Sequence, residues 1–268
     1  MKKLILAGCC FFAMSMAEAQ QNQGKIVYER ISQVQIRIND DAHGDLSNLI
    51  PKSRTDKFEL TFGNNQSLWK AAEEENVNDN VSGGDGVQIK MFVSGNDDVL
   101  FTNFETGKRI EKRELFEKTF IVEDTITKLK WKMTGETKTI LGMPCMQATT
   151  SRISTRTMMN MDNGKMERKD VQDTSKIIVW FTNTIPVSAG PAEFQGQLPG
   201  LILEMDVSNG RQTFKAISID QKADLASIKE PAGKKRLTPE EFRKERDKMM
   251  EEMQKNNSGG GNRTIRMQ

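Results

Sequence analysis

The chain has 268 residues, a formal net charge of +2 and a single histidine. The balanced charge excludes the one-sided basic field by which proteins bind nucleic acids. One histidine excludes zinc sites built from several histidines, and the sequence has no phosphate-binding glycine loop, dinucleotide fingerprint or Gly-x-Ser-x-Gly motif. We therefore expect no nucleic-acid partner and, because no catalytic constellation is readable, a protein that is not an enzyme.

Residues 1–19 are predicted to form a cleavable signal peptide. Lys2 and Lys3 precede an apolar run over residues 4–16, and residues 17–19 (Ala-Glu-Ala) fit the small-x-small pattern that signal peptidase cleaves. The run is too short for a stable membrane-spanning helix. We therefore expect a periplasmic or secreted mature chain that begins at Gln20 and has no transmembrane segment.

A lipoprotein signal is the alternative at this terminus. Residues 6–9 (Leu-Ala-Gly-Cys) resemble a lipobox, which would anchor the protein through lipid on Cys9. Only five uncharged residues separate Lys3 from Cys9, and the apolar run continues past the cysteine through Phe12. Cleavage near Ala19 is therefore favoured over lipid anchoring at Cys9.

The first half of the mature chain alternates between apolar and polar residues, as β-strands do. Residues 24–38 alternate, with Ile26 and Tyr28 on the apolar face and Arg30 as a polar break. Residues 58–62 alternate again, and a turn at 63–65 predicts a hairpin with a strand over 67–70. The acidic, Asn- and Gly-rich segment 71–86 is predicted to be a mobile surface loop.

Further strands are predicted up to the middle of the chain. Residues 87–93 and 99–104 are expected to pair, and a turn at 106–107 leads into a strand that reaches about Phe116. Short strands are predicted over 120–122 and 129–133. Strands over 136–141 and 145–153 flank a bend at 142–144, and the polar segment 158–170 is predicted to be a loop.

The apolar run over residues 176–182 predicts a central strand buried on both faces, because it is rich in β-branched and aromatic residues. A crossover with several prolines and glycines follows over residues 183–200. It leads into a hairpin with strands over 201–207 and 212–219, whose Asn209-Gly210 turn accepts positive φ.

The C-terminal segment differs from the rest. Residues 238–241 (Thr-Pro-Glu-Glu) form a capping box with proline at the first helical position. Phe242, Met249, Met250 and Met253 make a narrow apolar stripe on a helix that should end near Lys255. The sequence thus predicts a mainly β fold, an antiparallel curved sheet or open half-barrel with a C-terminal helix. Its β-rich domain spans residues 20–230, and a charged helix with a flexible tail spans 231–268.

The segment Leu198-Pro199-Gly200 raises the question of a binding site. Pro199 fixes φ and Gly200 permits a turn without a Cβ clash, so a structural role as the start of the next strand is favoured. The alternative is contact between the crossover and a ligand or partner. The residues assigned to such a contact are Trp180, Pro186, Pro191, Leu198, Pro199 and Gly200.

Sulfur-containing side chains suggest an alternative function. Signal cleavage leaves Cys145 as a lone cysteine, which cannot form an internal disulfide and is most simply explained by burial. Thiolate and thioether ligands suit Cu(I), although methionine also fills irregular gaps in cores. The candidate copper ligands are Cys145, Met143, Met146, Met158, Met159 and Met161.

These segments together resemble the GLPGLI family of exported proteins, found mainly in Bacteroidota. Residues 198–202 (Leu-Pro-Gly-Leu-Ile) match the motif of the family name, with Gln197 in place of its first glycine. The segments 180–182, 185–187 and 190–191 are similar to the family's approach to this motif. Residues 140–142 with Cys145 and Ala148, the opening GKIVYE and the hairpin around residues 67–69 are similar too. The resemblance implies export into a Gram-negative cell envelope and brings no established activity.

The preferred function is that of a non-enzymatic periplasmic binding or envelope-assembly protein, carrier-like in using a concave sheet. Its partner is expected to be an envelope protein, a lipid or a peptide, and no cofactor is expected. Copper or thiol handling through Cys145 and the methionines is the alternative function.

Overall fold

The computed structural model describes residues 22–33, 52–72, 80–82, 88–90, 98–115, 118–162, 165–233 and 235–257. For 80–82, 88–90, 155–162, 165–170 and 253–257 the description covers the backbone only. The predicted signal peptide, the lipobox cysteine and the C-terminal tail beyond residue 257 lie outside the described residues.

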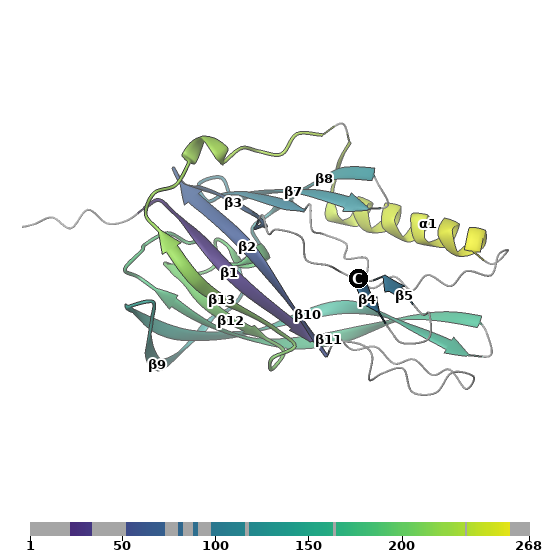
Figure 1. Cartoon of the computed structure of the whole chain (residues 1–268), viewed down its shortest axis with the longest axis horizontal. Coiled ribbons are helices and arrows are strands. Elements are labelled where there is room, and N and C mark those ends of the chain that lie inside the picture. The colour runs from purple at the N-terminus through teal and green to yellow at the C-terminus, as the bar shows by residue number, and fades with distance from the viewer. Residues whose placement is uncertain are drawn as a thin grey trace, which may run out of the picture.

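Strands make up most of the described chain, with one α-helix near its C-terminus (Figure 1). The strands are β1 (Gly24–Gln33), β2 (Ser53–Gly63), β3 (Gln66–Ala71), β4 (Asn80–Ser82), β5 (Gln88–Lys90), β6 (Val99–Asn103), β7 (Lys108–Leu115), β8 (Lys118–Thr125), β9 (Lys132–Ile140), β10 (Met143–Asp162), β11 (Lys165–Thr182), β12 (Leu201–Val207), β13 (Gln212–Asp220) and β14 (Arg236–Leu237). The helices are the 3-10 turns η2 (Ala192–Phe194) and η3 (Leu225–Ser227), and α1 (Pro239–Asn257).

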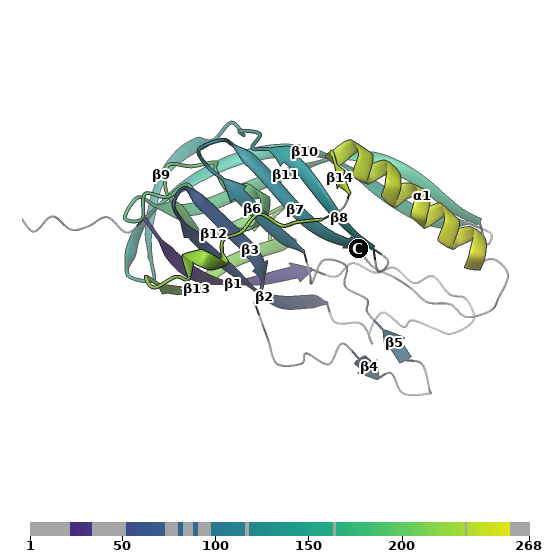
Figure 2. The same cartoon turned by 90° about the horizontal axis from the view of Figure 1, so that it is seen from above.

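Twelve of these strands form one sheet in the order β14-β8-β7-β6-β3-β2-β1-β13-β12-β11-β10-β9. Neighbouring strands in this sheet are antiparallel, except for the short β14, which runs parallel to β8. The sheet is open and strongly curved, with α1 beside β8 (Figures 1 and 2). The predicted fold class is therefore confirmed.

One face of the sheet, called here the inner face, carries the main core. Tyr28 lies opposite Phe58, and Ile26 lies opposite Leu60, so these side chains project from the same face. All four are buried. The alternation predicted in β1 and β2 is thus confirmed, and so is the turn between β2 and β3, where Asn64 and its neighbour adopt positive φ.

The crossover between β11 and β12 covers one end of the inner face. Its buried residues Ile185, Phe194 and Leu198 belong to the same core cluster as the inner residues of β1, β2 and β11. The Pro- and Gly-rich segment predicted as a crossover is therefore an ordered cover, and its packing decides which part of the inner face stays open.

Helix α1 covers the inner face at β8. Phe242 and Met249 are buried against Phe120 and its neighbours, and the rings of Phe120 and Phe242 meet edge to face at 5.6 Å. The predicted capping box is present, because the Thr238 backbone N–H donates to Glu241 at 2.8 Å and the Glu241 N–H donates back to the Thr238 hydroxyl at 3.3 Å.

The prediction of a loop over residues 158–170 is wrong. Here β10 and β11 pair up to Asp162 and Lys165, and Met158 lies opposite Lys169. β9 pairs with β10 only as far as Thr149, and β12 pairs with β11 only from Ile177 onward. The rest of the hairpin is a two-stranded ribbon beyond the neighbouring strands, so its polar sequence is compatible with strand structure.

The predicted pairing of 87–93 with 99–104 is also wrong, because β5 pairs with β4 while β6 lies between β3 and β7. β4 itself lies in the segment predicted as a loop. The apolar residues Leu100 and Phe101 of β6 are buried on opposite faces, which favours an interior place in the large sheet.

Two further strand predictions need correction. No strand forms over 126–131, where the Leu129 backbone N–H donates to the side chain of Gln197 at 3.0 Å instead of joining a ladder. In β11, Ile177, Val179 and Phe181 are fully buried, but Trp180 is only half-buried. This strand is therefore fully covered on the inner face alone.

Candidate functional site

Arginines occupy inner-face positions on strands that are far apart in the sheet. Arg109 lies opposite Asp124 in the β7–β8 pair, and Arg30 follows Tyr28 by two residues on β1. On β10, Arg152 lies two residues after Thr150, and Thr150 lies opposite the core residue Ile177. Because side chains alternate along a strand, all three arginines project from the inner face.

Curvature brings these arginines into one cavity. Seven strands separate β7 from β10 in the sheet order, which in a flat sheet would place them about 38 Å apart. Both strands nevertheless line one cavity of about 440 Å³. The cavity is lined by Arg30, Phe58, Trp69, Asp98, Leu100, Arg109, Glu111, Arg113, Arg152, Ala192 and Glu193.

The floor of the cavity is aromatic. The rings of Phe58 and Trp69 are stacked with centroids 4.9 Å apart, and both residues are buried. The guanidinium of Arg30 lies 4.4 Å from the centroid of the Phe58 ring and pairs with Asp56 at 2.8 Å. Stacking on an aromatic face holds a guanidinium in place without using up all of its hydrogen-bond donors.

Glu193 is a carboxylate that the protein itself places among the arginines. It belongs to η2, and its Oε1 accepts a hydrogen bond from Arg152 Nη1 at 2.7 Å. Burial acts to raise the pKa of Glu193, but the charge and hydrogen bond of Arg152, a backbone hydrogen bond and the charge of Arg109 together hold that pKa below its ordinary value. Glu193 is therefore ionised at neutral pH and shows that the arginine cluster accepts a carboxylate.

The arginines retain unused donors. The Nε atoms of Arg109, Arg113 and Arg152 are buried and have no hydrogen-bond partner among the described residues. Burial lowers the pKa of Arg113, but the charge and hydrogen bond of Glu111 raise it more, so it lies above its ordinary value. A buried donor without a partner costs free energy, so the protein holds these arginines on the inner face at some cost in stability.

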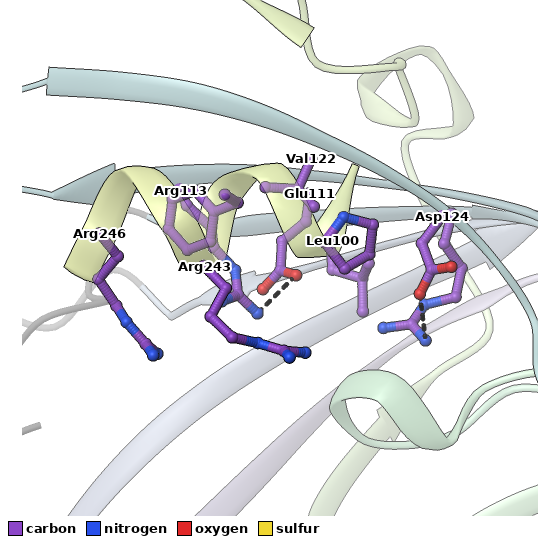
Figure 3. A pocket seen from close by; sticks show the side chains of 10 residues that line it. Leu100, Glu111, Arg113, Val122, Asp124, Arg243 and Arg246 are labelled. Carbon is purple, nitrogen blue, oxygen red and sulfur yellow. Dashed lines mark ion pairs between the residues drawn. The ribbon is translucent and has the colours of Figure 1, made fainter. Parts of the chain in front are cut away.

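A second cavity of about 200 Å³ continues the first toward α1 (Figure 3). The two share the lining residues Leu100, Arg109, Glu111 and Arg113. We call the two cavities together the inner groove. The charged residues lining it are Arg30, Arg109, Arg113, Arg152, Arg243 and Arg246, with Asp98, Glu111, Asp124 and Glu193.

The arginines are functional candidates that the sequence prediction missed. Arg30 was seen only as a polar break in the apolar face of β1. The segment 108–115 (KRIEKREL) alternates, with Arg109, Glu111 and Arg113 at inward positions. Charged residues at positions that should enter a core are the signal that could have pointed to this site.

The Leu198-Pro199-Gly200 segment has a structural role in the observed packing. Leu198 is buried, and a Cβ on Gly200 would meet the carbonyl oxygen of Thr182 and lie 2.8 Å from Asn183 Oδ1. Two residues later, the Ile202 carbonyl accepts a hydrogen bond of 2.5 Å from the buried Tyr28 hydroxyl. The segment therefore brings the start of β12 into close contact with β11.

Two glutamines anchor the crossover beside this segment. Gln197, which replaces the first glycine of the motif, donates to the Thr127 carbonyl at 3.0 Å and accepts from Leu129 N–H at 3.0 Å. The buried Gln195 accepts a hydrogen bond from Ser67 on β3. These contacts fix the crossover, and with it Glu193, relative to the groove.

The other residues of the predicted contact site do not gather on one surface. Pro186 and Pro199 are exposed, whereas Pro191 is buried. Trp180 lies on the outer side of β11, where the Lys138 ammonium is 4.3 Å from its ring centroid. The structure therefore separates Trp180 from the inner-face crossover, and a partner contact by these residues stays a prediction.

The candidate copper ligands near Cys145 point in different directions. Cys145 is 1% exposed and its Sγ lies 3.5 Å from the Met143 carbonyl oxygen, while Met146 is 38% exposed. Among the described residues, no group of three or more His, Cys, Asp or Glu is arranged to hold a metal ion. The side chains of Met158, Met159 and Met161 lie outside the description, so the copper alternative stays a prediction.

Burial raises the pKa of the Cys145 thiol, so the thiol is protonated at neutral pH and shielded. We expect the native protein and Cys145→Ser to contain the same number of thiols that react with Ellman's reagent. In denaturant, the wild type should show one more reactive thiol than Cys145→Ser. Rapid reaction of Cys145 in the native protein would contradict its burial and strengthen the copper alternative.

Comparison with known proteins links part of the chain to a family. The family model described as Protein of unknown function (Porph_ging) matches residues 131–204, which include β10, β11 and the crossover. No curated protein matches the sequence. The name GLPGLI for this group remains a prediction.

Solved structures that resemble the chain include two of PNGF-II, in the C2 and P21 space groups. Their TM-scores are 0.48 and 0.49, with sequence identities of 17% and 16%. Each comparison covers 83% of this chain and 32% of the PNGF-II chain, so the chain spans about a third of the length of these structures. No helix in the described part of the chain is long and apolar enough to cross a membrane.

Proposed function

We propose that this protein is an exported, non-enzymatic binding protein of the cell envelope, carrier-like in form, whose anionic ligand binds in the inner groove. The observation that carries the proposal is the convergence of Arg30, Arg109 and Arg152, from three separate parts of the sheet, on one cavity of about 440 Å³. That volume is within the range of small-molecule sites. Export is supported by the charged start, apolar run and cleavage pattern of residues 1–19.

Binding is favoured over catalysis by the state of the carboxylates in the groove. A general acid at neutral pH needs a raised pKa, but the pKa of Glu193 is lowered. Glu111 and Asp124 also face arginines, at 2.9 Å from Arg113 and 3.9 Å from Arg109. These groups are arranged as charge partners for guanidinium groups, which suits recognition of an anion.

The test measures the binding of citrate and of inorganic phosphate at low ionic strength by isothermal titration calorimetry. Arg109→Gln/Arg152→Gln should weaken binding at least about tenfold, because charge-assisted hydrogen bonds to the ligand are lost. Lys25→Gln/Arg211→Gln removes the same charge from residues that pair with Glu59 and Asp173 outside the groove. This control should bind like the wild type.

Two results would contradict the proposal. One is a wild-type protein that binds neither anion and carries no anionic molecule when purified and weighed by native mass spectrometry. The other is equal weakening of binding in both double variants, which would show a general charge effect and no site in the groove.

A further inference from the structure

We infer that α1 completes the inner groove and that the groove selects a ligand with separated carboxylates, one held near Arg109 and Arg152 and another near Arg243 and Arg246. This inference rests on the proposed function and adds to it the class of ligand and the role of the C-terminal helix. Three features of the groove support it.

The first feature is continuity. The cavity beside α1 and the larger cavity share Arg109, Glu111 and Arg113 on β7, so a ligand can reach from the crossover to the helix along one strand. Arg152 and Glu193 line only the larger cavity, and Arg243 and Arg246 of α1 line only the smaller one. Each cavity thus adds arginines of its own to the groove.

The second feature is the fixed position of the helix arginines. Residues three apart lie on the same side of a helix, and Figure 3 shows Arg243 and Arg246 extending in the same direction beside Arg113. Arg246 pairs with its neighbour Asp247 at 3.1 Å, and Arg243 has no ion pair with a described residue. Because Phe242 packs α1 against β8, the helix positions that carry Arg243 and Arg246 lie beside the sheet.

The third feature is the mixture of charges along β7. Arg109, Glu111 and Arg113 follow one another on the inner face, so a carboxylate lies between two guanidinium groups. A ligand with densely packed negative charge, such as a polyphosphate, would bring charge against Glu111. A ligand whose carboxylates are separated by neutral atoms can meet the arginines and avoid that repulsion.

The experiment compares four probes by calorimetry with the intact protein at low ionic strength. The first is an acetylated, amidated hexapeptide with glutamate at its first and last positions, and the second has only the first glutamate. The third is glutarate, a small dicarboxylate, and the fourth is tripolyphosphate. The proteins are the wild type, Arg243→Gln/Arg246→Gln and the control Lys244→Gln/Lys248→Gln, which removes the same charge from exposed positions of α1 that do not line the groove.

The wild type should bind the two-glutamate peptide more tightly than the other peptide and tripolyphosphate. Arg243→Gln/Arg246→Gln should lower the affinity for the two-glutamate peptide about fivefold, since two exposed ion pairs are lost. The same variant should bind the one-glutamate peptide with an affinity within twofold of the wild type. The lysine control should bind both peptides like the wild type. If glutarate binds as tightly as the two-glutamate peptide or more tightly, a small dicarboxylate is the source of the two carboxylates. If glutarate binds more weakly, the source is an extended chain.

Specific outcomes overturn the inference. If tripolyphosphate binds most tightly, the groove does not select separated carboxylates. If Arg243→Gln/Arg246→Gln binds the two-glutamate peptide like the wild type while Arg109→Gln/Arg152→Gln does not, the proposed function stands and the role of α1 fails. If the wild type binds none of the four probes, the inference fails. The proposed function fails with it only when citrate and phosphate also do not bind and no anionic molecule co-purifies.

Discussion

Gly200→Ala is expected to destabilise the protein by more than about 3 kcal/mol, at the upper end of the range for overpacking. The new Cβ would meet the carbonyl oxygen of Thr182 and approach Asn183 Oδ1 at 2.8 Å. Thr182 is fully buried at the end of β11, so its backbone cannot move away without disturbing the β11–β12 pair. Urea unfolding of the wild type and the variant measures the difference.

Gly135→Ala is the matched control for this substitution. Gly135 has φ of +86°, but no atom lies within 4 Å of the Cβ that alanine would add. Gly135→Ala should therefore lower the free energy of unfolding only by the strain of the left-handed conformation, about 1 kcal/mol. Equal stability losses in the two variants would show that close packing at Gly200 does not account for its place in the segment.

Alkaline unfolding is the second large effect, and Tyr28 is expected to cause it. Tyr28 is the only tyrosine in the chain, is fully buried and donates its hydroxyl to the Ile202 carbonyl at 2.5 Å. Burial raises its pKa well above that of an unfolded tyrosine, about 10. The contribution of Tyr28 to stability is thus fully present below pH 10 and is lost as the pH rises further, because the unfolded state then releases the proton more readily.

Phenolate absorbance at 295 nm reports on this single residue. It should stay absent above pH 10 in the folded protein and appear together with the loss of near-ultraviolet circular dichroism. Tyr28→Phe should have a free energy of unfolding about 1–3 kcal/mol lower than the wild type at neutral pH, because the Ile202 carbonyl is left without its partner. Its remaining stability should fall less above pH 10 than that of the wild type. Phenolate that forms before the fold is lost would contradict the burial of Tyr28.

Local patterns predicted the hairpins well, because a hairpin depends on residues close in sequence. The alternation in β1 and β2, the turn at Asn64 and the Asn209-Gly210 turn before β13 are all observed. The capping box at Thr238 also depends on contacts within one helical turn. Each of these features is stabilised by neighbours a few residues away, so the sequence pattern contains the necessary information.

Partners distant in sequence explain the errors. The polar segment 158–170 lacks apolar alternation, yet residues 158–162 and 165–170 are strand because each half of the ribbon provides the hydrogen-bond partners of the other. Residues 87–93 carry a strand signal, but the pairing of β6 with β3 and β7 depends on which strands compete for an interior place in the sheet. Alternation along one segment does not identify its neighbours.

The sequence by itself determined a mainly β fold, an open curved sheet and a capped C-terminal helix, because these depend on periodicity and turn residues. It also drew attention to Leu198-Pro199-Gly200. Only the tertiary structure decided that this segment is held by close packing against Thr182 and that the groove lies elsewhere. Arg109 and Arg152 are 43 residues apart in the chain, and seven strands lie between theirs in the sheet. They line one cavity because of the curvature of the whole sheet, which no local pattern specifies.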